Sequence, residues 1–502
     1  MIKNIFSRNT TKQKAFSIVL LLFVLSIFIR LPNLNRPVSK HYEFNSAVIL
    51  INIISWRQAG GGDRFHFTPV MNFQHSGDKR RPNNLYVDSH GNSVYLSFGP
   101  GWYIIPYFFY QLFQLPAEPV YLEILNLIFH LATILVFFYF LEQIIPAGQQ
   151  RKYFIISVAC CFMIFSPGPL WFMGNGYINT GIMLPFVLGA FMLLLPMLQE
   201  PGKISAGRLS ALGLLIIVLI YIDWYILFAC FLSGILALVK YRQSKKYGLL
   251  MLVLLISTIS GTALLFFQFS AHMGPEAVIH YWLSRSSERS LNLAGSSILT
   301  RLGYLFIYFL TSYLPLLILL LAGYLRCRRS GIIPNWSEKE ILFLKLFGSS
   351  LLFYNFFLFN WSSDHEFSIL PWSIFLSLPA ARVLGSLKNR RLIRGLLAFF
   401  LLSAVMQYYW INRPGTVSRD GLPYSSFKTL GESLKNIPAD YSIFISLEQN
   451  PMVEYYAGRN LFHSPDSLTA EKEMKELGII KAVWVDHKGY QVEHIHVIRK
   501  AD

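Results

Sequence analysis

Long runs of apolar residues alternate with short polar segments over most of the chain, from Ala15 to Trp410. A helix that crosses a bilayer needs about 20 mostly apolar residues. By this measure the pattern predicts about eleven spans, over 15–31, 119–143, 153–172, 177–198, 208–222, 224–240, 248–270, 302–325, 340–361, 366–384 and 393–411. The predicted fold class is an all-α polytopic membrane protein, with a small α/β domain after the last span.

The first segment between spans, 32–118, is too long for a simple connector. Within it, apolar residues recur at helical spacing from Phe44 to Gln58, which predicts an amphipathic helix. Apolar alternation around a Ser-His-Gly-Asn turn predicts a hairpin over 85–98. The aromatic run from Phe98 to Leu115 is short for a span and contains Pro106, which favours an interfacial or re-entrant helix. We therefore assign 1–414 to a transmembrane domain with a long loop at its external face.

The last part of the chain, 415–502, reads like an ordinary soluble domain. Helical patterns cover 427–436, 451–457 and 468–477, and strand patterns cover 441–446, 480–485 and 494–499. This alternation predicts a small α/β domain of βαβ type. No Gly-x-Gly-x-x-Gly fingerprint is present, so no nucleotide is assigned to it.

Composition supports the membrane class and excludes a nucleic-acid partner. Of the 502 residues, 54% are hydrophobic and 14% are charged, whereas soluble proteins carry roughly a quarter charged residues. The net charge is +17, but many lysines and arginines lie in short loops between apolar runs, where positive charge fixes topology. With a cytoplasmic N-terminus, these loops face the cytoplasm and the long loop and the tail lie outside. We expect a multi-pass plasma-membrane protein whose external face is periplasmic or extracellular.

Two acidic residues on the external face are candidates for catalysis. Glu43 opens the helix predicted over 44–58, where a carboxylate is well placed to accept a proton from a hydroxyl. The alternative is that Glu43 only stabilises the helix dipole. Asp223 lies between two apolar runs, and ionisable residues at membrane depth are often functional. A plain turn aspartate explains it equally well.

Two further groups of residues are candidates for binding. Arg285 and Arg289 are spaced i, i+4, so a helix would present both on one face. Paired guanidiniums suit a phosphate or diphosphate, although lipid headgroups would also satisfy them. Asp364, His365 and Glu366 form a titratable cluster that could bind a metal, hold a sugar or cap a helix. The pattern requires no cofactor, and whether a divalent metal takes part stays open.

Four segments together resemble the GT-C superfamily of membrane glycosyltransferases, and in particular the branch of protein O-mannosyltransferases and lipid A aminoarabinose transferases. The matching segments are Tyr42-Glu43-Phe44-Asn45-Ser46-Ala47, the proline-containing aromatic stretch at 98–107, the His-to-Pro stretch at 364–371 and the tail run at 448–459. The similarity covers most of the chain. One departure is Tyr42, which stands where the family often has the first acid of an Asp-Glu pair.

The resemblance implies a glycosyltransferase that uses a polyprenyl-phosphate-linked sugar and inverts the anomeric centre. Glu43 would be the base, with Asp223 as the second catalytic candidate. Arg285, Arg289 and Lys40 would hold the lipid phosphate. Residues that would hold the sugar or the acceptor are His41, Tyr42, Asp364, His365 and Glu366. The sugar and the acceptor, which could be a protein, lipid A, a cell-wall polymer or a glycolipid, stay open.

Three other functions are consistent with many spans. A transporter or flippase of lipid-linked sugars would usually show paired halves with broken helices, and no such repeat is present in the sequence. A lipid-linked oligosaccharide polymerase or ligase would place its large loop late in the chain rather than first. A non-catalytic assembly partner would tolerate the loss of both Glu43 and Asp223.

Overall fold

The computed structural model describes residues 2–38, 41–75, 86–290, 297–332, 334–412, 422–447 and 450–499. Lys40, which the sequence predicts to contact a phosphate, lies outside these residues. The predicted domain boundary at 414/415 also falls outside them. So do Leu85, at the start of the predicted hairpin, and the first two residues of the tail run at 448–459.

Helices occupy all eleven ranges predicted to span. Their bounds are α1 (Ile2–Arg30), α4 (Pro119–Ile144), α5 (Lys152–Phe165), α6 (Pro167–Phe172), α7 (Asn179–Ile182), α8 (Leu184–Gln199), α9 (Ala206–Ile220), α10 (Tyr225–Lys240), α11 (Lys246–Met273), α13 (Ile298–Arg329), α14 (Glu338–Phe357), α16 (Trp372–Ser386) and α17 (Arg390–Asn412). Prolines at Pro167, Pro185 and Pro371 coincide with helix starts, because proline lacks the N–H that an interior position needs. Several predicted ranges are therefore broken into two helices.

The helices form a bundle with an apolar outer surface. Within the described residues, seven helices are long and apolar enough to cross a membrane, and three more apolar helices, α5, α9 and α10, are shorter. Large apolar side chains such as Phe267 and Met406 are exposed on the outside of α11 and α17, where a bilayer would cover them. The predicted class, a multi-pass helical membrane protein with a small C-terminal sheet domain, is confirmed. The exact number of spans stays a prediction.

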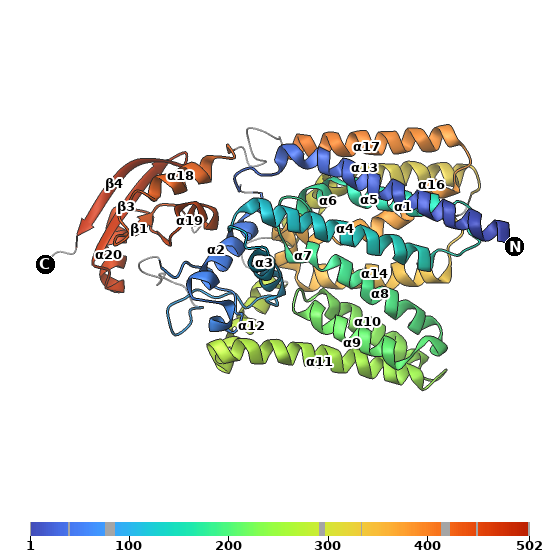
Figure 1. The fold of residues 1–502 in the computed structure, drawn as a ribbon, viewed down its shortest axis with the longest axis horizontal. Helices are drawn as coiled ribbons and strands as arrows, with labels where there is room; N and C mark the ends of the chain where they lie inside the picture. Colours follow the sequence, from blue (N-terminus) through green and yellow to red (C-terminus); the bar gives the residue numbers. More distant parts are fainter. Residues whose placement is uncertain are drawn as a thin grey trace.

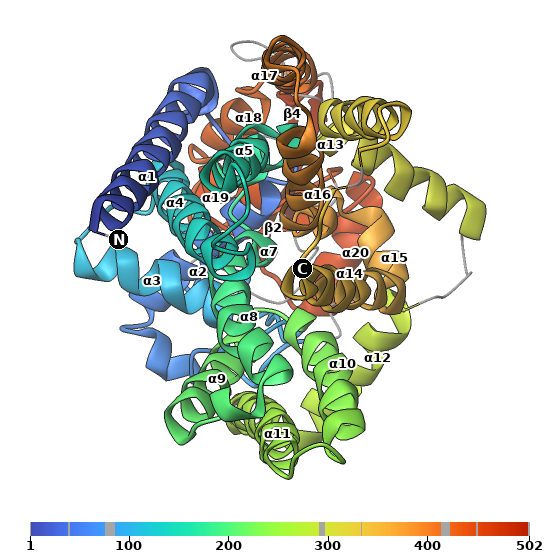
Figure 2. The same ribbon diagram turned by 90° about the vertical axis from the view of Figure 1, so that its right-hand side faces the viewer.

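Figure 2 views the bundle from its N-terminal end, with α1 at the left margin, α11 at the bottom and α5 and α16 nearer the middle. Figure 1 shows that α2 (Phe44–Gln58), α3 (Gly101–Leu112) and α12 (Pro275–Arg289) gather at the opposite end, between the bundle and the C-terminal sheet. These three helices and the sheet belong to segments that are predicted to be external, and in the described residues they lie at one end of the molecule.

The long first loop is packed more tightly than its sequence pattern predicts. Helix α2 has the predicted bounds, but it is buried on nearly every side, including Asn45 and Asn52. It packs against α3, α4 and α19 (Pro451–Ala457), so it is an interior helix rather than one with a solvated polar face. Within the described part of 85–98, the predicted hairpin reduces to a turn with one antiparallel bridge, between Val87 and Ser93.

The C-terminal domain has the predicted βαβ character. Its elements are α18 (Ser426–Leu434), β1 (Ser442–Ile445), α19 (Pro451–Ala457), β2 (Leu461–His463), α20 (Ser467–Leu477), β3 (Lys481–Lys488) and β4 (Gln491–Arg499). The strand order is β2-β1-β3-β4, with β1 parallel to both neighbours and β4 antiparallel to β3. Strand β2 was not predicted, because three residues are too few to show a period.

The sheet domain is joined to the end of the bundle by hydrogen bonds to the first loop. The side-chain oxygen of Asn460 accepts from the backbone N–H of Phe73 at 2.8 Å. The hydroxyl of Tyr455 donates to the carbonyl of Ala117 at 2.8 Å. The domain thus covers the first loop from the side away from the bundle.

Candidate functional site

Two turns that are far apart in the sequence meet at the covered end of the bundle. Tyr42 has φ 57°, a left-handed conformation that side chains rarely adopt and that is often found at functional sites. Its hydroxyl donates to the carbonyl of Asp364 at 3.1 Å and accepts from the backbone N–H of Glu366 at 3.1 Å. The predicted segments 41–43 and 364–366 are therefore in direct contact.

The three titratable residues of the second turn point to different partners. Asp364 is exposed and pairs with Arg301, with 3.2 Å between Oδ1 and Nη1. Glu366 is buried, accepts from the Thr311 hydroxyl at 2.6 Å and lies 4.0 Å from Nε2 of His41. The cluster is thus divided, and no group of three or more His, Cys, Asp or Glu side chains in the described residues is arranged to hold a metal ion.

His365 lies between these two acids in sequence but faces a cavity. Its ring stacks on Trp361, with 5.3 Å between centroids, and Nδ1 lies 2.7 Å from the Trp361 carbonyl. Since a carbonyl only accepts, Nδ1 carries the hydrogen and Nε2 is the acceptor. Burial, together with the smaller effect of the charge of Arg289, lowers the pKa of His365 to about 4. The imidazole is therefore neutral at pH 7.

The cavity beside His365 has a volume of about 150 Å³ and a wall rich in hydrogen-bond donors. Its polar lining consists of Asn45, Tyr95, Trp102, Tyr103, Asn179, Arg285, Arg289 and His365. Among the residues that the structure describes, no carboxylate lines it. Two donor atoms of this lining, Trp102 Nε1 and Arg289 Nε, are buried and have no hydrogen-bond partner among the described residues. A ligand with several acceptor oxygens would satisfy these donors.

The two predicted arginines form one edge of this cavity. Arg289 is buried, lies over the ring of Phe98 at 4.7 Å and donates to the Tyr95 hydroxyl at 3.2 Å. Arg285 forms an ion pair with Glu288 and donates from Nε to the Ser97 hydroxyl at 3.3 Å. Both come from α12 and line the same cavity, as their i, i+4 spacing predicts.

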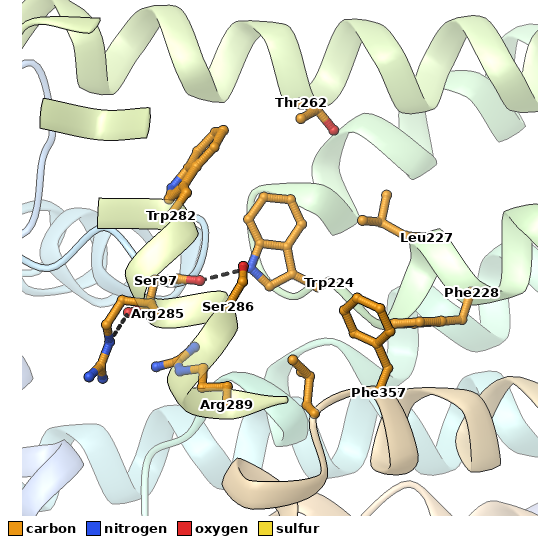
Figure 3. A pocket seen from close by; sticks show the side chains of 11 residues that line it. Ser97, Trp224, Leu227, Phe228, Thr262, Trp282, Arg285, Ser286, Arg289 and Phe357 are labelled. Atoms are coloured by element: carbon orange, nitrogen blue, oxygen red, sulfur yellow. Dashed lines mark hydrogen bonds between the residues drawn. The ribbon is translucent and has the colours of Figure 1, made fainter. Parts of the chain in front are cut away.

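A second cavity, of about 280 Å³, also has the arginine pair in its wall, and Figure 3 shows the side chains that line it. Most of its wall is apolar and comes from Trp224, Leu227, Phe228, Trp282, Phe357 and Leu358. Trp224 is fixed by a hydrogen bond from Nε1 to the Ser97 carbonyl at 2.8 Å. Arg285 and Arg289 line this cavity as well. The guanidiniums thus stand between a small polar cavity and a larger apolar one.

Asp223 is buried one layer behind the polar cavity. Its carboxylate accepts from the side-chain amide of Asn179, which lines the cavity, and from the hydroxyl of Tyr354 at 3.2 Å. The backbone N–H of Tyr225 also donates to it, at 2.9 Å. Burial raises the pKa of Asp223 to about 7. Asp223 therefore reaches the cavity through Asn179.

Glu43 lies on the side of the same turn that faces the C-terminal domain. It is buried and pairs with Arg36, with 2.9 Å between Oε2 and Nη1. The guanidinium of Arg36 stacks on Tyr424 at 3.9 Å. Glu43 lines neither of the two cavities described above. Its role as the base stays a prediction.

Several residues of this site were not singled out by sequence reasoning. Asn45, Tyr95 and Trp102 come from the first loop, whose fold their spacing does not reveal. Asn179 carried a usable signal, because an amide at the edge of an apolar run is unusual at membrane depth. Arg36 lies beside the predicted Glu43 but has no motif of its own.

No protein-family model matches the sequence, and no curated protein matches it. Solved structures do. ArnT from Cupriavidus metallidurans bound to undecaprenyl phosphate is similar with a TM-score of 0.58 at 12% identity, over 94% of this chain and 92% of that chain. The archaeal oligosaccharyltransferase AglB from Archaeoglobus fulgidus, in complex with an inhibitory peptide and a dolichol-phosphate, is similar with a TM-score of 0.54 at 13% identity, over 94% of this chain and 69% of that chain.

Both neighbours are membrane glycosyltransferases of the GT-C superfamily. At these identities the likeness defines the fold, and the fold of this chain is the GT-C fold. The fold that the resemblance of the four sequence segments implied is thereby confirmed.

Proposed function

We propose that this protein is a glycosyltransferase that takes a sugar from a polyprenyl-phosphate carrier and transfers it to an acceptor hydroxyl with inversion. The observation that carries the proposal is the arginine pair, Arg285 and Arg289, between a polar and an apolar cavity. A sugar-phosphoryl-polyprenol has the same three parts in the same order. Both structural neighbours have been crystallised or solved with a polyprenyl phosphate, which supports this donor class.

Each part of the donor has a matching chemical environment. The prenyl chain would enter the apolar cavity between α10, α11 and α12, where burial of each methylene contributes about 0.8 kcal/mol. The phosphate would accept hydrogen bonds from the guanidiniums, which suit its geometry. The sugar would occupy the small cavity. At about 150 Å³ this is smaller than most small-molecule pockets, so a single sugar ring fits the proposal better than an oligosaccharide.

In the reaction, the acceptor oxygen attacks the anomeric carbon as the bond from that carbon to the phosphate oxygen breaks. The lipid phosphate leaves with the electron pair, and the arginines stabilise the charge that develops on it. The acceptor proton passes to a base, which contributes about 10²–10⁴-fold. The cavity wall offers Nε2 of His365 for this role. A bound phosphate would offset the guanidinium charges and raise the pKa of His365 toward neutrality.

The sequence offers Glu43 as the base instead, and Asp223 as the second candidate. Asp223 would act through Asn179 by holding its amide toward the sugar. The reaction would take place at the end of the bundle that carries the C-terminal domain, which the charge pattern assigns to the external face of the plasma membrane. The C-terminal domain would cover the site and contribute to recognition of the acceptor.

The test uses the full-length protein in nanodiscs with radiolabelled sugar-phosphoryl-polyprenol donors. We expect donor turnover by the parent and a loss of roughly tenfold to 100-fold in donor affinity for Arg289→Gln, since a hydrogen bond to a charged group is worth about 1.5–3 kcal/mol. Arg326→Gln, at the opposite end of the bundle, is the matched control and should behave as the parent. Absence of both turnover and donor binding in the parent would overturn the proposal.

The same assay distinguishes His365 from Glu43 as the base. If His365 takes the proton, His365→Gln reduces the rate about 10²-fold or more while donor binding and thermal stability are kept. If Glu43 takes it, Glu43→Gln reduces the rate of the folded enzyme by this factor, with a lower thermal stability, and His365→Gln leaves the rate unchanged. Binding of donor without any turnover would instead favour a transporter or an assembly partner.

A further inference from the structure

The opposite end of the bundle carries a second groove that the proposed reaction does not use. It has a volume of about 310 Å³ and lies between the start of α5 and the start of α17. Three arginines and three apolar residues line it: Arg151, Phe154, Arg390, Ile393, Arg394 and Leu397. In Figure 1 these helix starts lie at the end that carries the N-terminus, away from the sheet domain.

The spacing of these residues makes two facing stripes. On α17, Arg390 and Arg394 are one turn apart, as are Ile393 and Leu397, so each turn presents a guanidinium beside an apolar side chain. At the start of α5, Arg151, the residue before the helix, and Phe154 add one more guanidinium and one more apolar side chain. The wall of the groove is therefore mainly apolar, and three arginines contribute to it.

Arg151 is held in place at some conformational cost. Its φ is 58°, a region that favours glycine or asparagine. Its Nη1 donates to the carbonyl of Leu387, at the end of α16, at 2.6 Å. Strained residues that persist are supported by their surroundings and are frequently functional. Here the strain sets a guanidinium at the edge of the groove.

The charges of the groove are not neutralised by the protein. Arg151, Arg390 and Arg394 are exposed and form no ion pair with any residue that the structure describes. In the same residues, no carboxylate lines the groove. A ligand for this site must therefore combine an anionic headgroup with apolar chains.

We propose that this groove binds an anionic phospholipid of the leaflet opposite the sugar-transfer site, with the phosphate between the three guanidiniums and an acyl chain along Phe154, Ile393 and Leu397. Basic pockets between transmembrane helices on the cytoplasmic side are suited to anionic lipid headgroups. The excess of basic residues predicted on this side agrees with that leaflet. The site is independent of the proposed transferase function.

Basic loops also fix topology, so the experiment must separate a groove from a general charge. The first double variant combines Arg390→Gln with Arg394→Gln, at two residues that line the groove. The matched control combines Lys388→Gln with Arg391→Gln, at two exposed residues that lie beside the groove and do not line it. Both pairs remove two positive charges from the same segment. All four side chains are exposed, so neither pair should prevent folding.

The measurement is binding of phosphatidylglycerol to the detergent-purified full-length protein, read by native mass spectrometry and by the shift in melting temperature. We expect phosphatidylglycerol to bind in preference to phosphatidylcholine, and its affinity to fall roughly tenfold to 30-fold in the groove pair. The neighbouring pair should stay within about twofold of the parent, as its charges act only at a distance. Inorganic phosphate at the same concentration should not displace the lipid.

Three outcomes would overturn the proposal. Equal losses in both pairs would mean that the charge of the segment acts without a groove. Equal binding of phosphatidylcholine would mean that the guanidiniums do not select the headgroup. Displacement by inorganic phosphate would mean that the site takes a free anion and that the apolar stripe contributes nothing.

Discussion

Glu43 and Arg36 form an ion pair that is almost completely withdrawn from solvent, with 2.9 Å between Oε2 and Nη1 and side-chain exposures of 3% and 9%. The pair lies where the first loop meets the C-terminal domain, because Arg36 also stacks on Tyr424. The predicted catalytic acid therefore has a structural role in addition to any chemical one.

This arrangement predicts that Glu43→Gln lowers the free energy of unfolding by about 3 kcal/mol, since loss of one partner leaves the other charge buried and uncompensated. The measurement is thermal or chemical unfolding in detergent. The double variant with Arg36→Met should recover part of the loss, because neither charge is then left alone. Glu432→Gln, in an exposed pair with Lys428, should change the stability by less than about 1 kcal/mol. Full stability of Glu43→Gln would contradict the prediction.

The apolar cavity predicts a dependence on the length of the donor lipid. Leu227→Trp should fill part of the cavity beside Trp224 and raise KM for long-chain donors several-fold, with little change for donors truncated to one or two isoprene units. The steric reason is that only a long chain extends past the arginines. Leu238→Trp makes the same substitution at an exposed position of α10 and should leave both KM values unchanged. Equal effects on short and long donors would show that the chain lies elsewhere.

From the lowered pKa of His365 we expect the folded protein to lose stability in acid. Its pKa is lowered to about 4 in the folded protein and is about 6.5 in the unfolded chain. The unfolded state therefore binds more protons between these values, so the contribution to stability is complete above about pH 6.5 and is lost as the pH falls toward 4. The loss is up to about 3 kcal/mol. His365→Gln should flatten the fall in melting temperature between pH 6.5 and 4, and an unchanged slope would refute the assignment.

From the raised pKa of Asp223 we expect folding stability to depend on pH with the opposite sign. Its pKa is raised to about 7 by burial, against about 3.9 in the unfolded chain. The folded state binds more protons in this range, so stability decreases as the pH rises from about 4 through 7. Asp223→Asn cannot ionise, and its melting temperature relative to the parent should increase from pH 5 to pH 8. A constant difference across this range would show that the carboxylate is ionised throughout.

The sequence by itself determined the class of the molecule and most of its helices and strands, but not the hairpin predicted over 85–98, whose described part forms a turn with one bridge. Apolar runs and basic loops defined the helices and grouped the external segments, because a bilayer requires about 20 apolar residues per span and selects the side on which positive charge remains. The αβ alternation of the tail was equally readable, apart from the three residues of β2. Even the bounds of α2 followed from its helical period.

Tertiary structure decided what each polar residue touches. The period of α2 indicated one polar face, yet its asparagines are buried because α19, from the far end of the chain, covers it. Asp364, His365 and Glu366 are adjacent in sequence, but their side chains diverge to Arg301, to the cavity and to Thr311.

Tertiary structure also separates Glu43 from the polar cavity, and it places two cavities around Arg285 and Arg289. These relationships join side chains up to several hundred positions apart. Local pattern is set by the solvent that each residue faces, whereas a site is set by long-range packing. For that reason the sequence named Arg285, Arg289 and His365 but not the other polar residues that line the cavity with them.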